Sequence, residues 1–469
     1  MSAHLSNPKK LASEGFRFCD VTPHSNLPDM KYSYLLLAAV LLCFGIAGCS
    51  HLTHQTAAAP PVPPVERPPY DPALTYKMVT FYQGRVRRNP QNGAIEWGQL
   101  ANAYLQRCRE TGDIADAQRA EKAAQRSIAI RSINNAPGWD ALERSLFVQH
   151  QFVKAEALAH ITSAKYQDDP VALMGYADAA LERGDYATTE RALKHPLVAG
   201  EGKIDPSVQA IQARMLDIKD ESALALQLLL KAQAAADANL DTPRENVAWF
   251  HMRVGDELAR LGHVDDAQKS YLEALELYPH DYKTMTGLAR LAAGRQDWAG
   301  TIAWGQKAAQ IVPTPEVVAL IGDAYAATGK SKEAEQQYRL IEAMGTISRA
   351  QSMVYDRYRA MFDANHNRHL DEALALAKRE MLIRQDIYAY DTLAWAEYKN
   401  GMLPRAAAAM KQALAFHTQD SLLFYHAGTI AKAQGDKVQS AADFTRASAL
   451  DPYFKPSAPD VTQHPYGGF

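Results

Sequence analysis

Gly329, Lys330 and Ser331 follow one another in the sequence, and such a triplet ends many loops that bind nucleotide phosphates. That loop needs its first glycine five residues before the Gly-Lys pair, and it must connect a β-strand to a helix. Here Gly322 lies seven residues before Gly329, Ala324 occupies the required position, and the preceding apolar residues have helical spacing. We therefore predict that this segment binds no nucleotide.

A second stretch has the spacing of a calcium loop, since Asp363, Asn365 and Asn367 occupy its first, third and fifth positions. The sixth position needs a glycine and the twelfth a bidentate glutamate, but the chain has Arg368 and Leu374 there. We predict no calcium site.

No other motif in the chain points to catalysis or to a metal. The sequence contains no GxSxG or HExxH pattern, no paired carboxylates in a catalytic setting and no CxxC pair. The two histidines of "HLTH" at 51–54 have no further ligands beside them. We predict no cofactor, no metal and no enzymatic activity. The alternative is an enzyme whose active site arose by convergence and is not visible in the sequence.

The charge balance argues against nucleic acid as a partner, and the cysteines show no sign of a reactive or metal-binding group. The 469 residues carry 53 acidic and 50 basic side chains, so the chain lacks the basic excess of a nucleic-acid-binding protein. Of the four cysteines, Cys19, Cys43 and Cys49 precede the region that we expect to fold. We expect Cys108 to be a buried free thiol rather than a reactive one.

The segment "MKYSYLLLAAVLLCFGIAGC" at 30–49 has a positive start at Lys31 and an apolar run from Leu35 to Ala47. This run is shorter than the roughly 20 residues of a spanning helix and fits a secretory signal. Its end, Ile46-Ala47-Gly48-Cys49, resembles a bacterial lipobox. The resemblance implies a lipoprotein signal peptide at 30–48 and lipid attachment, palmitate included, at Cys49. A plain signal peptide and an uncleaved anchor are the alternatives.

Three further expectations concern this front end. By analogy with lipoproteins, Ser50 after the cysteine favours the outer membrane, with the body facing the periplasm, over the inner membrane. A start at Met30 is expected rather than at Met1, which leaves 1–29 outside the protein. Residues 49–71 include the proline-rich stretch from Ala57 to Tyr70 and are expected to form an extended tether.

The body of the chain repeats one unit. In three segments a glycine precedes a second glycine by seven residues: Gly255 and Gly262, Gly322 and Gly329, and Gly428 and Gly435. From Gly262 the turn position recurs at Gln296, Gly329, Arg368, Gly401 and Gly435, mostly about 34 residues apart. Small residues would let two helices approach, and glycine would make the turn between them.

This pattern resembles the tetratricopeptide repeat (TPR), a helix-turn-helix hairpin. The unit from His251 to Pro279 supplies Gly255, Leu258, Ala267, Tyr271 and Ala274 at the family's positions. The resemblance implies an all-α fold, a right-handed α-solenoid of stacked TPR hairpins.

Weaker copies extend the array upstream, so that roughly ten hairpins are expected from Pro72 to Pro452. A late glycine at Gly112 predicts a longer first helix in the first of them. A hairpin without its glycine is expected from Ser207. Loop-like breaks divide the array into degenerate hairpins at 72–240 and a C-terminal array at 241–453, followed by an irregular tail at 454–469.

In the family, the first helices of the hairpins line a concave face that binds extended peptides or helices. Two neighbouring units place a candidate partner groove there, made of Tyr388, Asp391, Trp395, Tyr398, Lys399, Tyr425 and Lys432. The alternative is that Trp395 and Tyr398 pack between hairpins or against the C-terminal tail.

These observations favour one function over two others. We expect a non-catalytic, lipid-anchored scaffold that binds protein partners of an assembly in the bacterial cell envelope and touches the membrane through its lipid anchor alone. Recognition of glycan or peptidoglycan strands by the aromatic groove is the alternative, and an enzyme comes third. A repeat fold does not by itself specify a partner.

Overall fold

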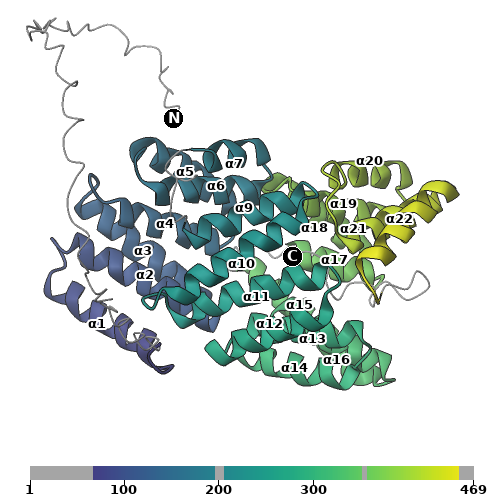
Figure 1. Ribbon diagram of the computed structural model, residues 1–469, viewed down its shortest axis with the longest axis horizontal. Helices are drawn as coiled ribbons and strands as arrows, with labels where there is room; N and C mark the ends of the chain where they lie inside the picture. The colour runs from purple at the N-terminus through teal and green to yellow at the C-terminus, as the bar shows by residue number, and fades with distance from the viewer. Residues whose placement is uncertain (1–66, 196–204, 351–355, 454–469) are drawn as a thin grey trace, which may run out of the picture. The chain divides into compact units, whose positions relative to one another are not determined.

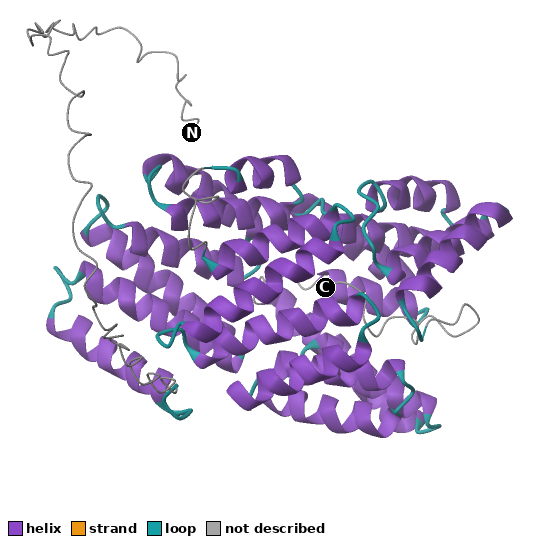
Figure 2. Ribbon diagram, viewed as in Figure 1, coloured by secondary structure: helices purple, strands orange, loops and turns teal. Residues whose placement is uncertain are grey.

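The computed structural model describes residues 67–195, 205–350 and 356–453, and in these residues every regular element is an α-helix (Figures 1 and 2). Helix α1 (Leu74–Arg88) comes first. Ten hairpins follow: α2 (Ala94–Thr111) with α3 (Ile114–Ile130), α4 (Ala136–Val148) with α5 (Phe152–Lys165), α6 (Pro170–Arg183) with α7 (Tyr186–Leu193), α9 (Pro206–Ile218) with α10 (Ser222–Ala238), α11 (Arg244–Arg260) with α12 (Val264–Leu277), α13 (Tyr282–Gly294) with α14 (Trp298–Ile311), α15 (Pro315–Ala327) with α16 (Ser331–Ala350), α17 (Asp356–Asn365) with α18 (Leu370–Ile383), α19 (Ile387–Lys399) with α20 (Leu403–Ala413), and α21 (Ser421–Ala433) with α22 (Lys437–Leu450). The predicted all-α solenoid of stacked hairpins is confirmed.

Each hairpin turns through a residue with positive φ. Glycine takes this conformation in six hairpins, at 112, 184, 262, 329, 401 and 435. His150, Asp220 and Gln296 take it in three others, although a Cβ makes it costly. The turn predicted at Gln296 is therefore confirmed. The turn predicted at Arg368 also lies between two helices, α17 and α18, but the positive φ is taken by its neighbours Asn367 and His369, at 50° and 43°.

Small residues allow the close helix packing that the repeat predicted. The ring of Tyr271 on α12 inserts between α11 and α13, only 2.6 Å from where a Cβ on Gly255 would lie and 2.7 Å from one on Gly287. An aromatic ring sixteen residues after Gly322 and after Gly428 occupies the same place in two other hairpins, through Tyr338 and Phe444. Gly322 is thus a packing residue, and Gly329 beyond it makes the turn with φ of 76°.

Hairpins distant in sequence also touch. The backbone N–H of Gln385 donates to the carbonyl of Arg183 at 3.0 Å, and the Thr418 hydroxyl donates to the carbonyl of Ile218 at 2.7 Å. One apolar cluster includes Leu181 and Ile211 from the first half of the chain and Ile387 and Leu423 from the second. Side chains from hairpins about 200 residues apart therefore share one core.

Two further expectations can be checked in the described residues. Cys108 is a buried free thiol, as predicted, and burial raises its pKa to about 11. Helix α2 has 18 residues and is capped by Gly112, which agrees with the longer first helix predicted there. In the described part of the chain no helix is both long and apolar enough to span a membrane. The expectations for 1–66 and for the tail at 454–469 lie outside the described residues.

Candidate functional site

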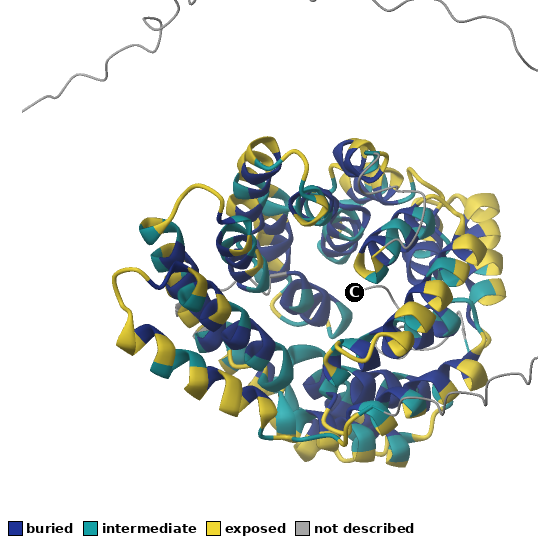
Figure 3. Ribbon diagram, turned by 60° about the vertical axis from the view of Figure 1, so that its left-hand side comes forward, coloured by how far each residue is buried: buried dark blue, intermediate teal, exposed yellow. Residues whose placement is uncertain are grey.

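A cavity of about 680 Å³ is lined by helices from most of the hairpins. Its walls come mainly from the first helix of each hairpin, from α4 through α19, together with the end of α18. Figure 3 shows that exposed residues lie mainly on the opposite, outward sides of the helices. This arrangement matches the inner face that the repeat predicted.

Charged side chains of both signs line this inner cavity in equal numbers. The seven basic ones are Arg214, Arg253, Arg260, Lys283, Arg290, Arg357 and Arg384, and the seven acidic ones are Glu182, Asp217, Asp256, Glu257, Glu316, Glu380 and Asp386. Five tyrosines, at 186, 271, 282, 358 and 388, lie among them. A wall of this kind presents hydrogen-bonding and ionic groups without a net charge.

One largely buried ionic cluster of the cavity wall joins four helices, α6, α17, α18 and α19. Asp386 caps α19 through the backbone N–H groups of residues 388 and 389 and accepts from Arg357 at 2.6 Å and from Arg384 at 2.9 Å. Arg384 also reaches Glu182 of α6 at 3.1 Å. Burial alone would raise the pKa of Asp386, but the two guanidinium groups outweigh it and hold that pKa at about 2. The cluster therefore stays ionised at neutral pH.

A second cluster lies on α11 and α13. Asp256 accepts from the Tyr271 hydroxyl at 2.7 Å, from Arg253 at 3.1 Å and from Arg290 at 3.2 Å. Arg290 continues to Glu316 of α15 at 3.5 Å. The same carboxylate thus fixes the ring that packs between α11 and α13.

Lys283 differs from the other charged residues of the cavity. Each of the six arginines has a carboxylate within 4 Å, whereas the ion pairs of the described residues include none for Lys283. Its ammonium lies 5.7 Å from the centre of the Tyr282 ring. Burial alone would lower the pKa of Lys283, but the nearby Tyr282, Glu245 and Asp281 outweigh burial, so the net effect is a raised pKa. The side chain is therefore a cation at neutral pH. Among the basic side chains of the lining, Lys283 is thus a cation without an ion pair in the described residues, although Glu245 and Asp281 stabilise its charge.

The predicted groove residues do come together, but mostly inside the core. Trp395 is 0% exposed, and the centre of its ring lies 4.0 Å from that of His426 and 5.0 Å from that of Tyr398, both in stacked orientation. Asp391 is buried 2.8 Å from His426, and Tyr425 is also buried. Trp395 and Tyr398 therefore pack between hairpins, which is the alternative given for them above.

The other three residues of that set have different surroundings. Lys399 donates to Asn367 at 3.0 Å and its ammonium lies 5.1 Å from the Trp395 ring. Lys432 is exposed on α21, outside the cavity. Tyr388 lines the inner cavity, and its hydroxyl donates to Asp420 at 3.3 Å. Of the seven predicted residues, Tyr388 is the one that belongs to this surface.

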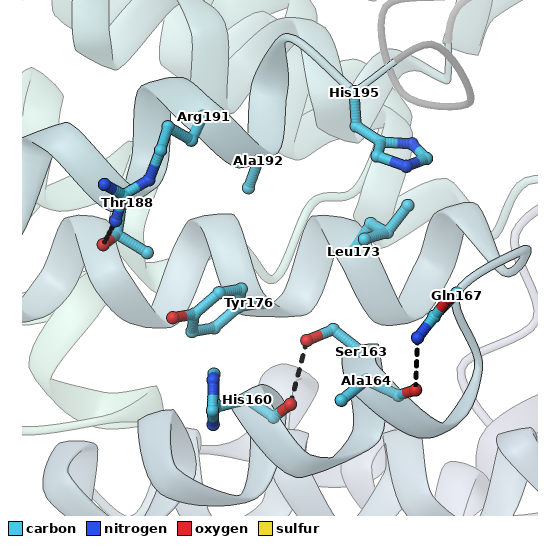
Figure 4. Close-up of a pocket in the computed structure, with 10 residues that line it drawn as sticks. All are labelled: His160, Ser163, Ala164, Gln167, Leu173, Tyr176, Thr188, Arg191, Ala192 and His195. Carbon is cyan, nitrogen blue, oxygen red and sulfur yellow. Dashed lines mark hydrogen bonds between the residues drawn. The ribbon is translucent and has the colours of Figure 1, made fainter.

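A smaller hollow of about 390 Å³ lies between α5, α6 and α7 (Figure 4). Ser163 donates to the carbonyl of His160, and Arg191 donates to Thr188, so these polar groups bond within their own helices. The calcium-like stretch is similarly occupied, since Asp363 accepts from Arg359 at 2.6 Å. In the residues that the structure describes, no group of three or more His, Cys, Asp or Glu side chains could hold a metal.

The charged lining of the inner cavity was missed from the sequence. A signal was present, because Arg253, Asp256 and Arg260 recur at three- and four-residue spacing along one helix. That spacing says that the groups share a face. It does not say that hairpins from the other half of the chain close over this face.

Comparison with known proteins identifies one repeat directly. Residues 250–281, which span most of α11 and all of α12, match the family model described as tetratricopeptide repeat. No curated protein matches the chain. The match supports the tetratricopeptide assignment of this hairpin, and arrays of such repeats commonly bind other proteins.

Several solved structures are similar to this chain. They include the APC/C hetero-tetramer Cut9–Hcn1, with 12% identity, 83% of this chain and 93% of that chain covered, and a TM-score of 0.31. The human IFIT1 dimer with m7Gppp-AAAA has 14% identity, coverage of 80% and 86%, and a TM-score of 0.43. The same dimer with PPP-AAAA has 14% identity, coverage of 80% and 87%, and a TM-score of 0.41.

Proposed function

We propose that this protein is a non-catalytic scaffold of the bacterial cell envelope that is anchored by lipid at Cys49 and binds a segment of a partner protein in its inner cavity. The observation that carries the proposal is the cavity itself, which the first helices of successive hairpins line with charged groups and tyrosines. A repeat array creates such an extended inner surface from many small contributions.

The chemistry of the lining favours a polypeptide. Ion pairs and tyrosine hydroxyls offer donors and acceptors at many points, and tyrosine rings supply rigid contact area. A polyanion such as RNA would meet seven carboxylates together with the seven cations. Lys283 supplies one cation that an acidic side chain of the partner could neutralise.

The anchor and the location are inferred from the sequence. The lipobox at 46–49 and Ser50 support lipidation at Cys49 and an outer-membrane location facing the periplasm, with translation from Met30. The proline-rich tether would hold the folded body off the bilayer. The resulting protein would use neither nucleotide nor cofactor.

The glycan-binding alternative depended on aromatic rings open to solvent. Trp395 is fully buried, and a sugar ring could stack on it only if the core opened. We therefore propose that the protein binds another protein, and we do not propose glycan binding.

The anchor is tested by growing cells with radiolabelled palmitate. The wild-type protein should carry the label and a Cys49→Ala variant should not. Equal labelling of both proteins would refute lipid attachment at Cys49.

The binding site is tested by crosslinking in cells followed by affinity isolation. We expect Lys283→Gln to lose a crosslinked partner protein that the wild type retains, because the neutral amide cannot pair with an acidic group. Lys411→Gln, on the exposed side of the second helix α20, is the matched control and should keep that partner. Loss of the partner in both variants, or in neither, would contradict the inner cavity as its site.

A further inference from the structure

Helix α1 exposes an unusual amount of apolar surface for a helix at the edge of a folded body. Leu74 is 54% exposed, Tyr76 51%, Met78 38% and Phe81 56%. Thr75, Val79 and Val86 are the three residues of α1 that are buried. The helix is therefore held along one side and leaves a row of large apolar side chains in solvent.

The exposed residues of α1 change in character along the helix. Leu74, Met78, Phe81, Arg85 and Arg88 are spaced by three or four residues, so they lie in one row along the helix. The first three are apolar and the last two are cationic. An apolar half is thus followed by a basic half on the same face.

All the charged residues of helix α1 are basic. It contains Lys77, Arg85, Arg87 and Arg88 and no Asp or Glu. Lys77 pairs with Asp71 before the helix, and Arg85 pairs with Glu96 on α2. The ion pairs of the described residues include none for Arg87 or Arg88, and both are exposed.

We infer that this face of α1, made of Leu74, Met78, Phe81, Arg85 and Arg88, together with the exposed Arg87 beside it, binds the surface of a membrane that contains anionic lipid. Aromatic and aliphatic side chains beside several arginines are typical of helices that lie at a bilayer interface. Each exposed arginine attracts anionic headgroups, and the apolar row enters the boundary between headgroups and acyl chains.

The position of α1 in the chain favours a membrane over another protein. It is the first of the described helices, and 24 residues lie between Cys49 and Leu74. A lipid at Cys49 would hold α1 near the bilayer at a high effective concentration. Even a weak affinity of α1 for the bilayer would then keep the helix bound to it. The inference rests on the proposed anchor for this local concentration, and it adds a second membrane contact to the lipid.

The test uses the chain from residue 50 onward, which contains the whole compact unit from Glu66 and lacks the lipid site. We expect this protein to sediment with vesicles of phosphatidylethanolamine and phosphatidylglycerol and not with vesicles of phosphatidylcholine alone. Combined Arg87→Glu and Arg88→Glu substitutions should weaken vesicle binding about tenfold or more. Phe81→Ser should weaken it through the lost apolar contact.

Val438→Ser, which removes an apolar side chain that is 83% exposed on α22, is the matched control and should bind vesicles as the parent protein does. Unchanged helical circular dichroism would show that each variant is folded. Failure of the parent protein to bind anionic vesicles, or equal binding by all variants, would overturn the inference. Dimerisation that the α1 substitutions abolish, without vesicle binding, would also overturn it and assign the face to a second copy of the chain. None of these results depends on Cys49, so palmitate labelling decides the anchor separately.

Discussion

At the scale of single residues, the position of Tyr271 explains why the repeat requires glycine. Its ring occupies the space that side chains at 255 and 287 would otherwise fill, and its hydroxyl bonds to Asp256. One aromatic residue therefore spaces two helices and fixes a charged group of the inner cavity.

Gly255→Ala should destabilise the protein. The new methyl group would lie 2.6 Å from the Tyr271 ring, and the buried ring has little room to move. We expect a loss of about 1–3 kcal/mol in the free energy of unfolding, measured with urea. Gly84→Ala in α1 is the control, since its methyl group would meet only the flexible end of Arg88 at 3.8 Å. It should stabilise by up to about 1 kcal/mol, and a loss of similar size in both variants would contradict this account.

Glu143 should make stability depend on pH. Burial and the nearby carboxylates of Asp140 and Asp178 raise its pKa from 4.5 to about 8. The folded state therefore holds a proton that the unfolded chain releases, so its contribution to stability is complete below pH 4.5 and is lost as the pH rises to about 8.

Glu143→Gln should remove this loss, because the amide does not ionise. Between the two pH values the wild type should lose on the order of 3 kcal/mol relative to the variant, measured as the free energy of unfolding in urea. Glu333→Gln, in the exposed first turn of α16, serves as the control and should follow the wild type. A constant difference between wild type and Glu143→Gln across this pH range would contradict the prediction.

At the scale of elements, helix starts differ in what their capping residues do. Asp436 caps α22 through the backbone N–H of Gln439 and is exposed. Asp386 caps α19 in the same way, but it is buried and also pairs with Arg357 and Arg384. The second cap therefore joins α17, α18 and α19 as well as starting a helix.

Asp386→Ala should be far more damaging than Asp436→Ala. Removal of the buried carboxylate leaves two guanidinium groups facing each other, and we expect a loss of about 3–5 kcal/mol in the free energy of unfolding. Loss of the exposed cap should cost about 1 kcal/mol. Thermal or urea unfolding of the two variants measures both values, and equal losses would argue against the buried cluster as a joint between helices.

The hairpins could be predicted from the sequence because their determinants are local. Glycines such as Gly255 and Gly262, and the aromatic ring of Tyr271, act on residues within one or two helices, so their spacing reveals the unit. The turn at 367–369 contains the predicted Arg368, but the sequence did not reveal that Asn367 and His369, rather than a glycine, take the left-handed conformation there.

The candidate site could not be predicted in the same way. Position within the repeat placed Trp395 on the inner side of its helix, but the next hairpin contributes His426 and covers the ring. The charged cavity depends on contacts such as that of Arg384 with Glu182, about 200 residues apart. Such pairs follow from the way the array curves, which no local pattern encodes.

At the scale of the whole folded unit, the two halves of the chain stabilise each other and together enclose the inner cavity. Arg260 of α11 reaches Asp217 on α9 and the carbonyl of Gln419 before α21. The cavity is therefore built by hairpins from both halves. We propose that a partner protein binds to this surface.

Site-specific photocrosslinking in living cells tests that claim most directly. A photoreactive amino acid of lysine length would replace Lys283 in the cavity or, as the control, Lys411 on the exposed side of α20. We predict that light produces a discrete crosslinked partner protein from position 283 and not from position 411. A partner captured only from position 411, or no crosslink from 283 while the folded protein is present in the envelope, would contradict the account.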